Sequence, residues 1–222
     1  MQYLLHPEAG APRITLEGDA YRYLIKVRRH RAGDRVALRT GDDDAIHFYT
    51  LEGIGRRTAE LVWQASETLA VTPRRALHIG WCRIDPKAIE KVLPILNEIG
   101  VNTITFIDCD RSQKNFRLDH TRLEKILTNS SQQCGRSDRM RIATAPDIAT
   151  FLADHPDARL LHFSDTTLPC DEENATIIIG PEGGFTDAET ALFTPDRIVG
   201  LDTPTILRSE SAAVAVASRL VL

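Results

Sequence analysis

One stretch near the carboxyl end decides the fold class of this chain: Ile177-Ile178-Ile179-Gly180-Pro181-Glu182-Gly183-Gly184-Phe185-Thr186-Asp187-Ala188-Glu189. Its three consecutive isoleucines indicate a strand buried on both faces, as in a parallel sheet. The paired glycines allow a tight turn. Thr186 and Glu189 then have the spacing of a capping box, which predicts that a helix begins directly after the turn. The N–H groups of such a helix start point toward ligands at the carboxyl edge of a parallel sheet.

A second glycine-bearing turn follows, Gly200-Leu201-Asp202-Thr203-Pro204-Thr205-Ile206-Leu207-Arg208-Ser209-Glu210-Ser211-Ala212-Ala213. It also comes after a hydrophobic strand, so both turns are expected at the same edge of the sheet. A single Gly-Gly turn is more often purely structural, and a single Arg–Glu pair is most often a salt bridge. The two turns together favour one ligand held mainly by peptide groups.

The ligand is expected to carry little or no phosphate. The chain contains neither a GxGxxG nor a GxxxxGK[ST] motif, and residues 142–222 contain no lysine. Nothing in the sequence resembles a Ser-His-Asp triad or a pair of catalytic carboxylates. The sequence therefore favours a reaction that needs little covalent help from the protein.

Strands and helices alternate from residue 74 onward. Asp85 before Pro86 predicts a helix start, and Gly100 predicts its end. The expected strands are 76–81, 103–107, 159–164, 176–180 and 196–200, and the expected helices are 85–99, 118–130, 148–152 and 211–222. This order predicts an α/β domain over residues 74–222, with a parallel sheet and helices on both faces.

Residues 1–70 are predicted to form a small β-rich domain. Its end overlaps a predicted linker over residues 66–75. Alternating segments indicate strands at 13–16, 34–40, 45–52 and 58–64, and Asp19 is placed to begin a short helix that reaches Arg28. Several short strands with one helix suggest a small barrel.

Composition and charge set limits on the function. The chain is 42% hydrophobic and 26% charged, as is typical of a soluble globular protein, and neither a membrane span nor a secretory signal is expected. The four cysteines have no metal-binding spacing, so free thiols in a reducing compartment and no metal are expected. The net charge is only −4, yet residues 20–39 hold seven basic residues against one acid. This cluster is either an anion-binding face or an ordinary solvated surface.

Several of these segments resemble the bacterial 16S ribosomal RNA (uracil-N3)-methyltransferase family, which belongs to the SPOUT class of knotted methyltransferases. The resemblance covers nearly the whole chain. It rests on residues 1–7, 23–28, 97–101, 111–112, 133–136, 179–185, 189, 201 and 206–212. Pro94-Ile95 stands where the family commonly has Gln-Lys, Ser211 replaces a usual Thr, and residues 202–205 are additional.

The resemblance implies a PUA-like RNA-binding β-barrel and a SPOUT domain whose carboxyl end forms a trefoil knot. It implies a cytoplasmic homodimer that uses S-adenosylmethionine to methylate 16S ribosomal RNA or the small ribosomal subunit. Arg208 would orient the uracil or stabilise it as N3 loses its proton, and Glu210 would brace the loop. The cofactor would contact Leu161, His162, Phe163, Gly180, Pro181, Glu182, Gly183, Gly184, Gly200, Leu201, Ile206, Leu207, Arg208 and Ser209. RNA would contact Arg22, Lys26, Arg28, Arg29, Arg31, Arg111 and Arg136.

Three other functions stay open at this point. One is a SPOUT enzyme that acts on a ribose 2′-OH or on transfer RNA, although those relatives usually show an Asn where this chain has Arg208-Ser209-Glu210. Another is a non-catalytic RNA-binding protein of the same fold, which would not bind S-adenosylmethionine. The third is a nucleotide-binding enzyme that uses residues 180–184 for phosphates, which ATP competition would reveal.

Overall fold

The computed structural model describes residues 1–112, 117–171 and 173–222, and the chain divides into two compact units. The first unit comprises Met1–Thr72 with Ser131–Asp138, and the second comprises Pro73–Ser130 with Arg139–Leu222.

The first unit is built on a five-stranded sheet with the order β1-β3-β4-β5-β2. β1 pairs with β3 in parallel, and the other neighbours are antiparallel. The strands are β1 (Leu4–Leu5), β2 (Arg13–Leu16), β3 (Arg35–Arg39), β4 (Ala45–Ile54) and β5 (Ala59–Thr68). Among the described residues β1 and β2 remain edges of the sheet, so it is open where the sequence suggested a small barrel. β1 was not predicted. With only two residues, it offers few backbone groups to a strand that would close the barrel.

The predicted helix after Asp19 is present in an unusual form. α1 (Gly18–Tyr21) passes directly into a π-helix, η1 (Arg22–Val27). Tyr21 and Leu24 are buried in the core of the first unit, beside residues such as Leu16 and Leu61. The basic residues of this segment therefore extend from a short helix whose apolar side is anchored in the core.

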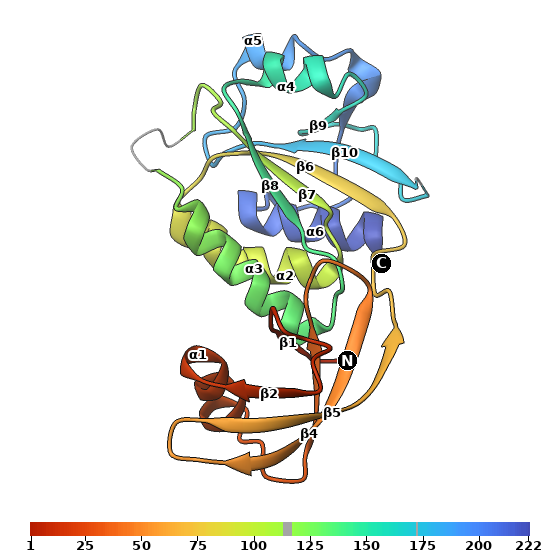
Figure 1. Ribbon diagram of the computed structural model, residues 1–222. Helices are drawn as coiled ribbons and strands as arrows, with labels where there is room; N and C mark the ends of the chain where they lie inside the picture. Colours follow the sequence, from red (N-terminus) through yellow and green to blue (C-terminus); the bar gives the residue numbers. More distant parts are fainter. Residues whose placement is uncertain (113–116, 172) are drawn as a thin grey trace. The chain divides into compact units, whose positions relative to one another are not determined.

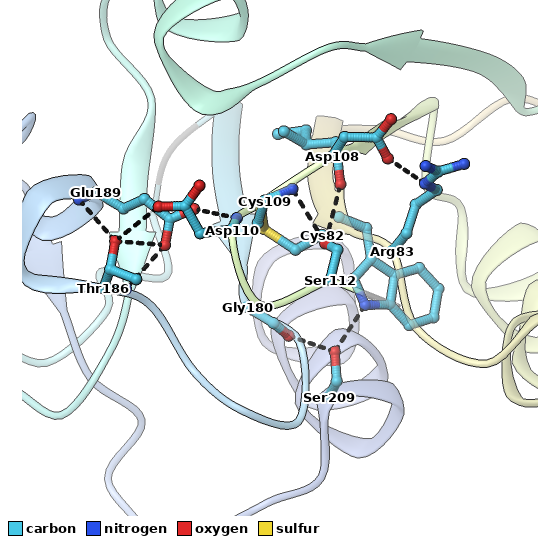
Figure 2. Close-up of a disulfide and its surroundings, with 12 residues drawn as sticks. Cys82, Arg83, Asp108, Cys109, Asp110, Ser112, Gly180, Thr186, Glu189 and Ser209 are labelled. Atoms are coloured by element: carbon cyan, nitrogen blue, oxygen red, sulfur yellow. Dashed lines mark hydrogen bonds and ion pairs between the residues drawn. A yellow bond between two sulfur atoms is a disulfide. The ribbon is translucent and has the colours of Figure 1, made fainter. Parts of the chain in front are cut away.

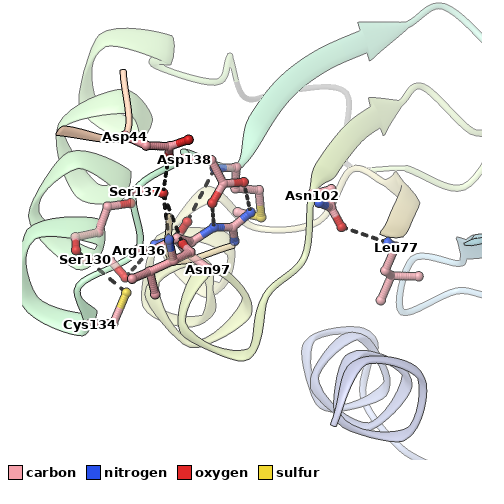
Figure 3. A network of polar contacts seen from close by, with 12 residues as sticks. Asp44, Leu77, Asn97, Asn102, Ser130, Cys134, Arg136, Ser137 and Asp138 are labelled. Atoms are coloured by element: carbon pink, nitrogen blue, oxygen red, sulfur yellow. Dashed lines mark hydrogen bonds and ion pairs between the residues drawn. The ribbon is translucent and has the colours of Figure 1, made fainter. Parts of the chain in front are cut away.

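Residues 131–138, which begin with the last turn of α3 (His120–Cys134), belong to the first unit, although the rest of that helix belongs to the second. The Ser137 hydroxyl donates to an Asp44 carboxylate oxygen at 3.0 Å (Figure 3), and Tyr3 Oη donates to the Arg136 carbonyl at 2.7 Å. Within the segment, Arg136 pairs with Asp138 through two hydrogen bonds of 2.7 and 2.8 Å. Hydrogen bonds thus join this segment to the rest of the first unit, and a partly buried ion pair braces it internally.

The second unit contains a parallel sheet, as predicted, with the order β11-β9-β10-β6-β7-β8. Its strands are β6 (Ala76–Cys82), β7 (Thr103–Ile107), β8 (Arg141–Ala145), β9 (Arg159–Leu161), β10 (Asn174–Ile179) and β11 (Ile198–Val199). β10 lies between β6 and β9, in agreement with its continuous apolar sequence. β8 was not predicted, because this edge strand buries none of its five residues fully.

Helices cover both faces of this sheet (Figure 1). They are α2 (Pro86–Ile99), α3 (His120–Cys134), α4 (Ile148–Asp154), α5 (Asp187–Thr190) and α6 (Ser209–Val221). Ile177 and Ile179 pack in one core with residues of α2 and α6, whereas Ile178 packs in another with Phe151 of α4. No helix of the described chain is both long and apolar enough to span a membrane.

The end signals predicted for α2 are confirmed. The Asp85 side chain accepts a hydrogen bond from the Lys87 N–H at 2.7 Å, with Pro86 in the first turn. Gly100 ends the helix with φ of 117°, in the left-handed region that favours glycine.

The expectation of four free thiols is wrong. Cys82 and Cys109 form a disulfide, whereas Cys134 and Cys170 are free and exposed. The two bonded cysteines are 27 residues apart in sequence. Cys82 ends β6, and Cys109 lies two residues beyond the end of the neighbouring parallel strand β7, in which Ile107 is paired with Cys82. Their Cα atoms lie 5.6 Å apart, an ordinary distance for a disulfide.

The disulfide predicts a specific response to reductant. Without reductant, the denatured protein should show two titratable thiols, and after reduction it should show four. Closing a 27-residue loop should contribute about 3 kcal/mol to the free energy of unfolding, so reduction should lower the midpoint of denaturation. The variant C134S/C170S is the control, since it removes only the free thiols. Four thiols in the unreduced wild type would contradict the assignment.

Candidate functional site

A cavity of about 940 Å³ lies at the carboxyl edge of the parallel sheet. Its walls come from the segments that follow β9, β10 and β11 and from the start of α6. This is the edge at which ligands bind in open parallel sheets. The lining residues are Arg111, Leu161, His162, Phe163, Ser164, Asp165, Ile179, Gly180, Pro181, Glu182, Gly183, Gly184, Phe185, Gly200, Leu201, Thr203, Thr205, Ile206, Leu207, Arg208, Ser209 and Ala212.

The first wall is the turn between β10 and α5. The Gly184 N–H donates to the Pro181 carbonyl at 2.9 Å, and Gly184 has φ of 68°, which a residue with a side chain rarely adopts. A Cβ atom on Gly180 would lie 2.9 Å from the ring of Phe185. The predicted capping box is confirmed, with reciprocal hydrogen bonds between Thr186 and Glu189.

The second wall is the bend at Gly200, where the segments after β9 and β11 lie side by side in a parallel bridge between Thr167 and Gly200. The Gly200 N–H donates to the Thr166 carbonyl, and its carbonyl accepts from the Leu168 N–H, both at 2.8 Å. A Cβ atom at this position would lie 2.5 Å from the Ser164 carbonyl oxygen. Only glycine fits here, so the loop after β9 can approach the loop after β11 closely.

The start of α6 is joined to the sheet by one hydroxyl (Figure 2). Ser209 Oγ donates to the Gly180 carbonyl at 2.6 Å and accepts from Trp81 Nε1 at 2.8 Å. Both Ser209 and Trp81 are buried. Ser209, predicted as a cofactor contact, therefore also links β6, the end of β10 and α6.

A fourth segment, residues 108–112 after β7, lies against the first wall (Figure 2). The Glu189 carboxylate is buried and accepts from the Thr186 N–H at 2.8 Å and from the Asp110 N–H at 2.9 Å. Arg111 Nη1 donates to the carbonyls of Gly183 and Phe185 at 2.9 and 3.1 Å. The turn is thus supported from a loop that lies far from it in sequence.

The cavity combines apolar walls with a few charges. Arg111 and Arg208 face it as cations, and Asp165 and Glu182 as anions. Phe163 and Ile206 are 74% and 82% exposed, so its rim presents two large apolar side chains to solvent. Peptide groups, apolar surface and balanced charge suit a mainly apolar ligand with scattered polar atoms.

A second cavity, of about 480 Å³, lies at the opposite, amino edge of the same sheet. Its His78 donates to or accepts from Thr105 Oγ1 at 2.8 Å. Burial, with further contributions from His155 and Arg141, lowers the pKa of His78 to about 4. His78 is therefore neutral at pH 7. The carboxyl-edge cavity is the larger of these two and lies where parallel sheets bind ligands, so it is the better candidate for the functional site.

The structure brings all fourteen predicted cofactor residues into the lining of the carboxyl-edge cavity. Arg208, predicted to be catalytic, lies in that lining with an exposed side chain, whereas Glu210 lies outside it in the first turn of α6. Proximity to the predicted turns could have identified most of the other lining residues, but no local signal placed Arg111 here, and it was assigned to RNA alone. The lining residues that were not predicted as cofactor contacts are Arg111, Ser164, Asp165, Ile179, Phe185, Thr203, Thr205 and Ala212.

The predicted RNA residues of the first unit divide into two groups. Arg22, Lys26, Arg29 and Arg31 are exposed near the π-helix, and Arg28 stacks over the Tyr23 ring with 5.1 Å to its centroid. Arg29 has φ of 61°, an uncommon backbone conformation for a residue other than glycine. By contrast, the Arg136 side chain is only 5% exposed and is paired with Asp138. The described residues contain no group of three or more potential metal ligands.

Both units match known protein families. Residues 72–221 match the family described as "RNA methyltransferase domain", and residues 16–62 match the family described as "RNA methyltransferase PUA domain". The ribosomal RNA small subunit methyltransferase E of Helicobacter pylori (strain J99 / ATCC 700824) is 35% identical, over an alignment that covers 98% of this chain and 98% of its own. The ribosomal RNA small subunit methyltransferase E 2 of Borreliella burgdorferi is 24% identical, over 93% of this chain and 89% of its own.

Solved structures share the fold. A Legionella pneumophila protein in complex with S-adenosylmethionine matches with a TM-score of 0.80 and 22% identity, over 98% of this chain and 94% of that one. The ribosomal RNA small subunit methyltransferase E of Neisseria gonorrhoeae, bound to S-adenosylmethionine, matches with a TM-score of 0.76 and 19% identity, over 98% and 95% of the two chains.

Proposed function

The chain belongs to the RNA methyltransferase family that includes ribosomal RNA small subunit methyltransferase E, and from this premise we propose that it transfers a methyl group from S-adenosylmethionine to N3 of a uridine in 16S ribosomal RNA. The observation that carries the proposal is the cavity at the carboxyl edge, where two glycine-bearing bends meet. The uridine N3 specificity follows from the resemblance of the motif that ends in Arg208-Ser209-Glu210.

The residues of the cavity fit S-adenosylmethionine. This ligand has no phosphate, and the segments that form the two bends contain no lysine. Its adenine and ribose need apolar contact and a few peptide hydrogen bonds, which residues 180–184, 200–201 and 206–209 would provide together with Leu161, His162 and Phe163. The carboxylates of Asp165 and Glu182 favour a cation. When bound, S-adenosylmethionine supplies a methyl group on a positively charged sulfonium.

The protein's own contribution to the reaction is orientation, exclusion of water and one charge. Holding two reactants in line can contribute about 7–11 kcal/mol in favourable cases. Arg208 stands directly before α6 with an exposed side chain facing the cavity. We assign its guanidinium to orienting the uracil and stabilising the negative charge that develops as N3 loses its proton. Glu210, in the first turn of α6, is assigned to bracing the loop and Arg208.

The first unit is assigned to RNA binding, and residues 74–222 are assigned to methyl transfer. Exposed Arg22, Lys26, Arg29 and Arg31 would contact phosphates, and these contacts position RNA without reading its sequence. Arg28 lends its charge to the same surface. Arg136 is left out because its guanidinium is buried against Asp138.

Three features of the family complete the proposal. The segments after β9 and β11, which pair at Gly200, are assigned to a trefoil knot. The protein is assigned to a homodimer in the cytoplasm, and the exposed Phe163 and Ile206 support association near the cavity. Light scattering in solution tests the dimer: the mass of a single chain at micromolar concentration would remove it. The apolar side of α6 packs in its own unit, so it does not by itself support a dimer.

The function is tested by the chemical position of the methyl group. The protein is incubated with S-adenosylmethionine and with either naked 16S ribosomal RNA or assembled small subunits, and the digested RNA is analysed by mass spectrometry. We expect 3-methyluridine. Arg208→Ala should lower turnover at saturating substrate by about 100-fold, because one preorganised charge is removed, while the affinity for S-adenosylmethionine stays within about twofold of wild type.

Arg197→Ala is the matched control, since this half-buried arginine lies outside the cavity and pairs with the exposed Asp157. A methyl group on a ribose 2′-OH would indicate a different SPOUT activity, and no binding of S-adenosylmethionine would indicate a non-catalytic RNA-binding protein. Unchanged turnover of Arg208→Ala would remove Arg208 from the mechanism.

RNA binding by the first unit is tested by salt dependence. The variant R28E/R29E/R31E should bind 16S ribosomal RNA more weakly, and the slope of log affinity against log salt should become shallower by about 0.9 for each phosphate that the protein no longer neutralises. The variant K87E/K91E/K125E, in which three exposed lysines of α2 and α3 are reversed, changes net charge equally and serves as the control. Equal slopes in the two variants would count against this surface.

A further inference from the structure

Arg111 makes a contact that its predicted role in RNA binding does not explain. Its Nη1 atom donates to two carbonyls of the β10–α5 turn, those of Gly183 and Phe185. The stem of the side chain runs along the same turn, since a Cβ atom on Gly183 would lie 3.4 Å from Arg111 Cβ. One nitrogen atom thus holds both sides of Gly184.

With these two hydrogen bonds, two peptide groups of the turn have both their N–H and their carbonyl hydrogen-bonded. The peptide between Gly183 and Gly184 donates its N–H to the Pro181 carbonyl at 2.9 Å, and its carbonyl accepts from Arg111. The peptide between Phe185 and Thr186 donates its N–H to Glu189 at 2.8 Å, and its carbonyl also accepts from Arg111. Each peptide plane is held at both ends, so the peptide between them has a defined orientation.

Arg111 is itself held in place. The neighbouring Asp110 N–H donates to Glu189, the same carboxylate that accepts from Thr186. Cys109 is bonded to Cys82, and its N–H donates to Ser112 Oγ at 3.0 Å. The residues on both sides of Arg111 are therefore anchored, which limits the entropy cost of ordering its side chain.

We propose that Arg111 is a positioning residue, which holds the glycine turn in the conformation that receives the methyl donor. This inference rests on the proposed function, since it assigns the turn to S-adenosylmethionine. A turn already in its bound conformation costs less to order when the ligand arrives, and the benefit appears as affinity. In this role Arg111 acts on the ligand through the backbone of residues 183–185.

The test uses the fact that both hydrogen bonds come from one nitrogen. A lysine ammonium can donate to two carbonyls, so Arg111→Lys should bind S-adenosylmethionine within about threefold of wild type. Arg111→Met keeps the apolar stem but has no donor, and it should bind about tenfold more weakly. In kinetic assays its KM for S-adenosylmethionine should rise by a similar factor, with kcat little changed. The control is Arg122→Met, which replaces an exposed arginine on α3.

Two further readouts distinguish positioning from other roles. Hydrogen exchange of the Gly184 and Thr186 amides in the free protein should be faster in Arg111→Met than in wild type. An RNA-contact role would instead raise the KM for RNA and leave the affinity for S-adenosylmethionine unchanged, and that result would overturn the proposal. If the wild type binds no S-adenosylmethionine, the proposed function fails, and hydrogen exchange alone then tests whether Arg111 holds the turn. Faster exchange in Arg111→Met supports this role, and unchanged exchange overturns it.

Discussion

The parallel pairing of β10 with β6 on one side and β9 on the other is the constraint on which the site depends. It buries both faces of Ile177–Ile179 and brings Gly180 to the carboxyl edge of the sheet. The neighbouring strands end at the same edge, so the segments after β9 and β11 meet the turn after β10 there. Buried side chains then join the turn after β10 to other segments by hydrogen bonds. Ser209 connects Trp81 of β6 with Gly180, and Glu189 connects Thr186 with Asp110 in the segment after β7.

A pocket formed this way combines backbone turns with apolar side chains, which is consistent with a ligand recognised by shape and by a few peptide hydrogen bonds. The glycines are needed for geometric reasons. At Gly200 a side chain would collide with another loop, and Gly184 has a backbone conformation that side chains disfavour. The protein can then contribute to methyl transfer chiefly by holding two reactants in line, with Arg208 as a nearby charge.

Local signals in the sequence predicted the helix ends and turns, whereas elements that depend on long-range contacts were missed. The limits of α2 follow from Asp85-Pro86 and Gly100, and the capping box follows from Thr186 and Glu189. The positions of the cavity residues also followed from sequence, because each strand end carries its own turn. Their roles in binding came from the resemblance, and they remain predictions. By contrast, β8 has a mixed polar sequence and gains its structure from pairing with β7.

Two side chains show most clearly why the rest could not be predicted. The partner of Cys82 is 27 residues away and becomes a neighbour only through the order of the strands. Arg111 appears in the sequence as one more basic residue, and only the folded chain shows that its guanidinium lies on the carbonyls of Gly183 and Phe185.

The most direct test of the central claim is a crystal structure of the protein with S-adenosylmethionine. We predict that the adenine, ribose and sulfonium occupy the cavity of about 940 Å³ at the carboxyl edge, with most polar contacts made by main-chain groups of residues 180–184 and 200–208. A ligand bound elsewhere, or an empty cavity at a saturating concentration of the ligand, would contradict this prediction.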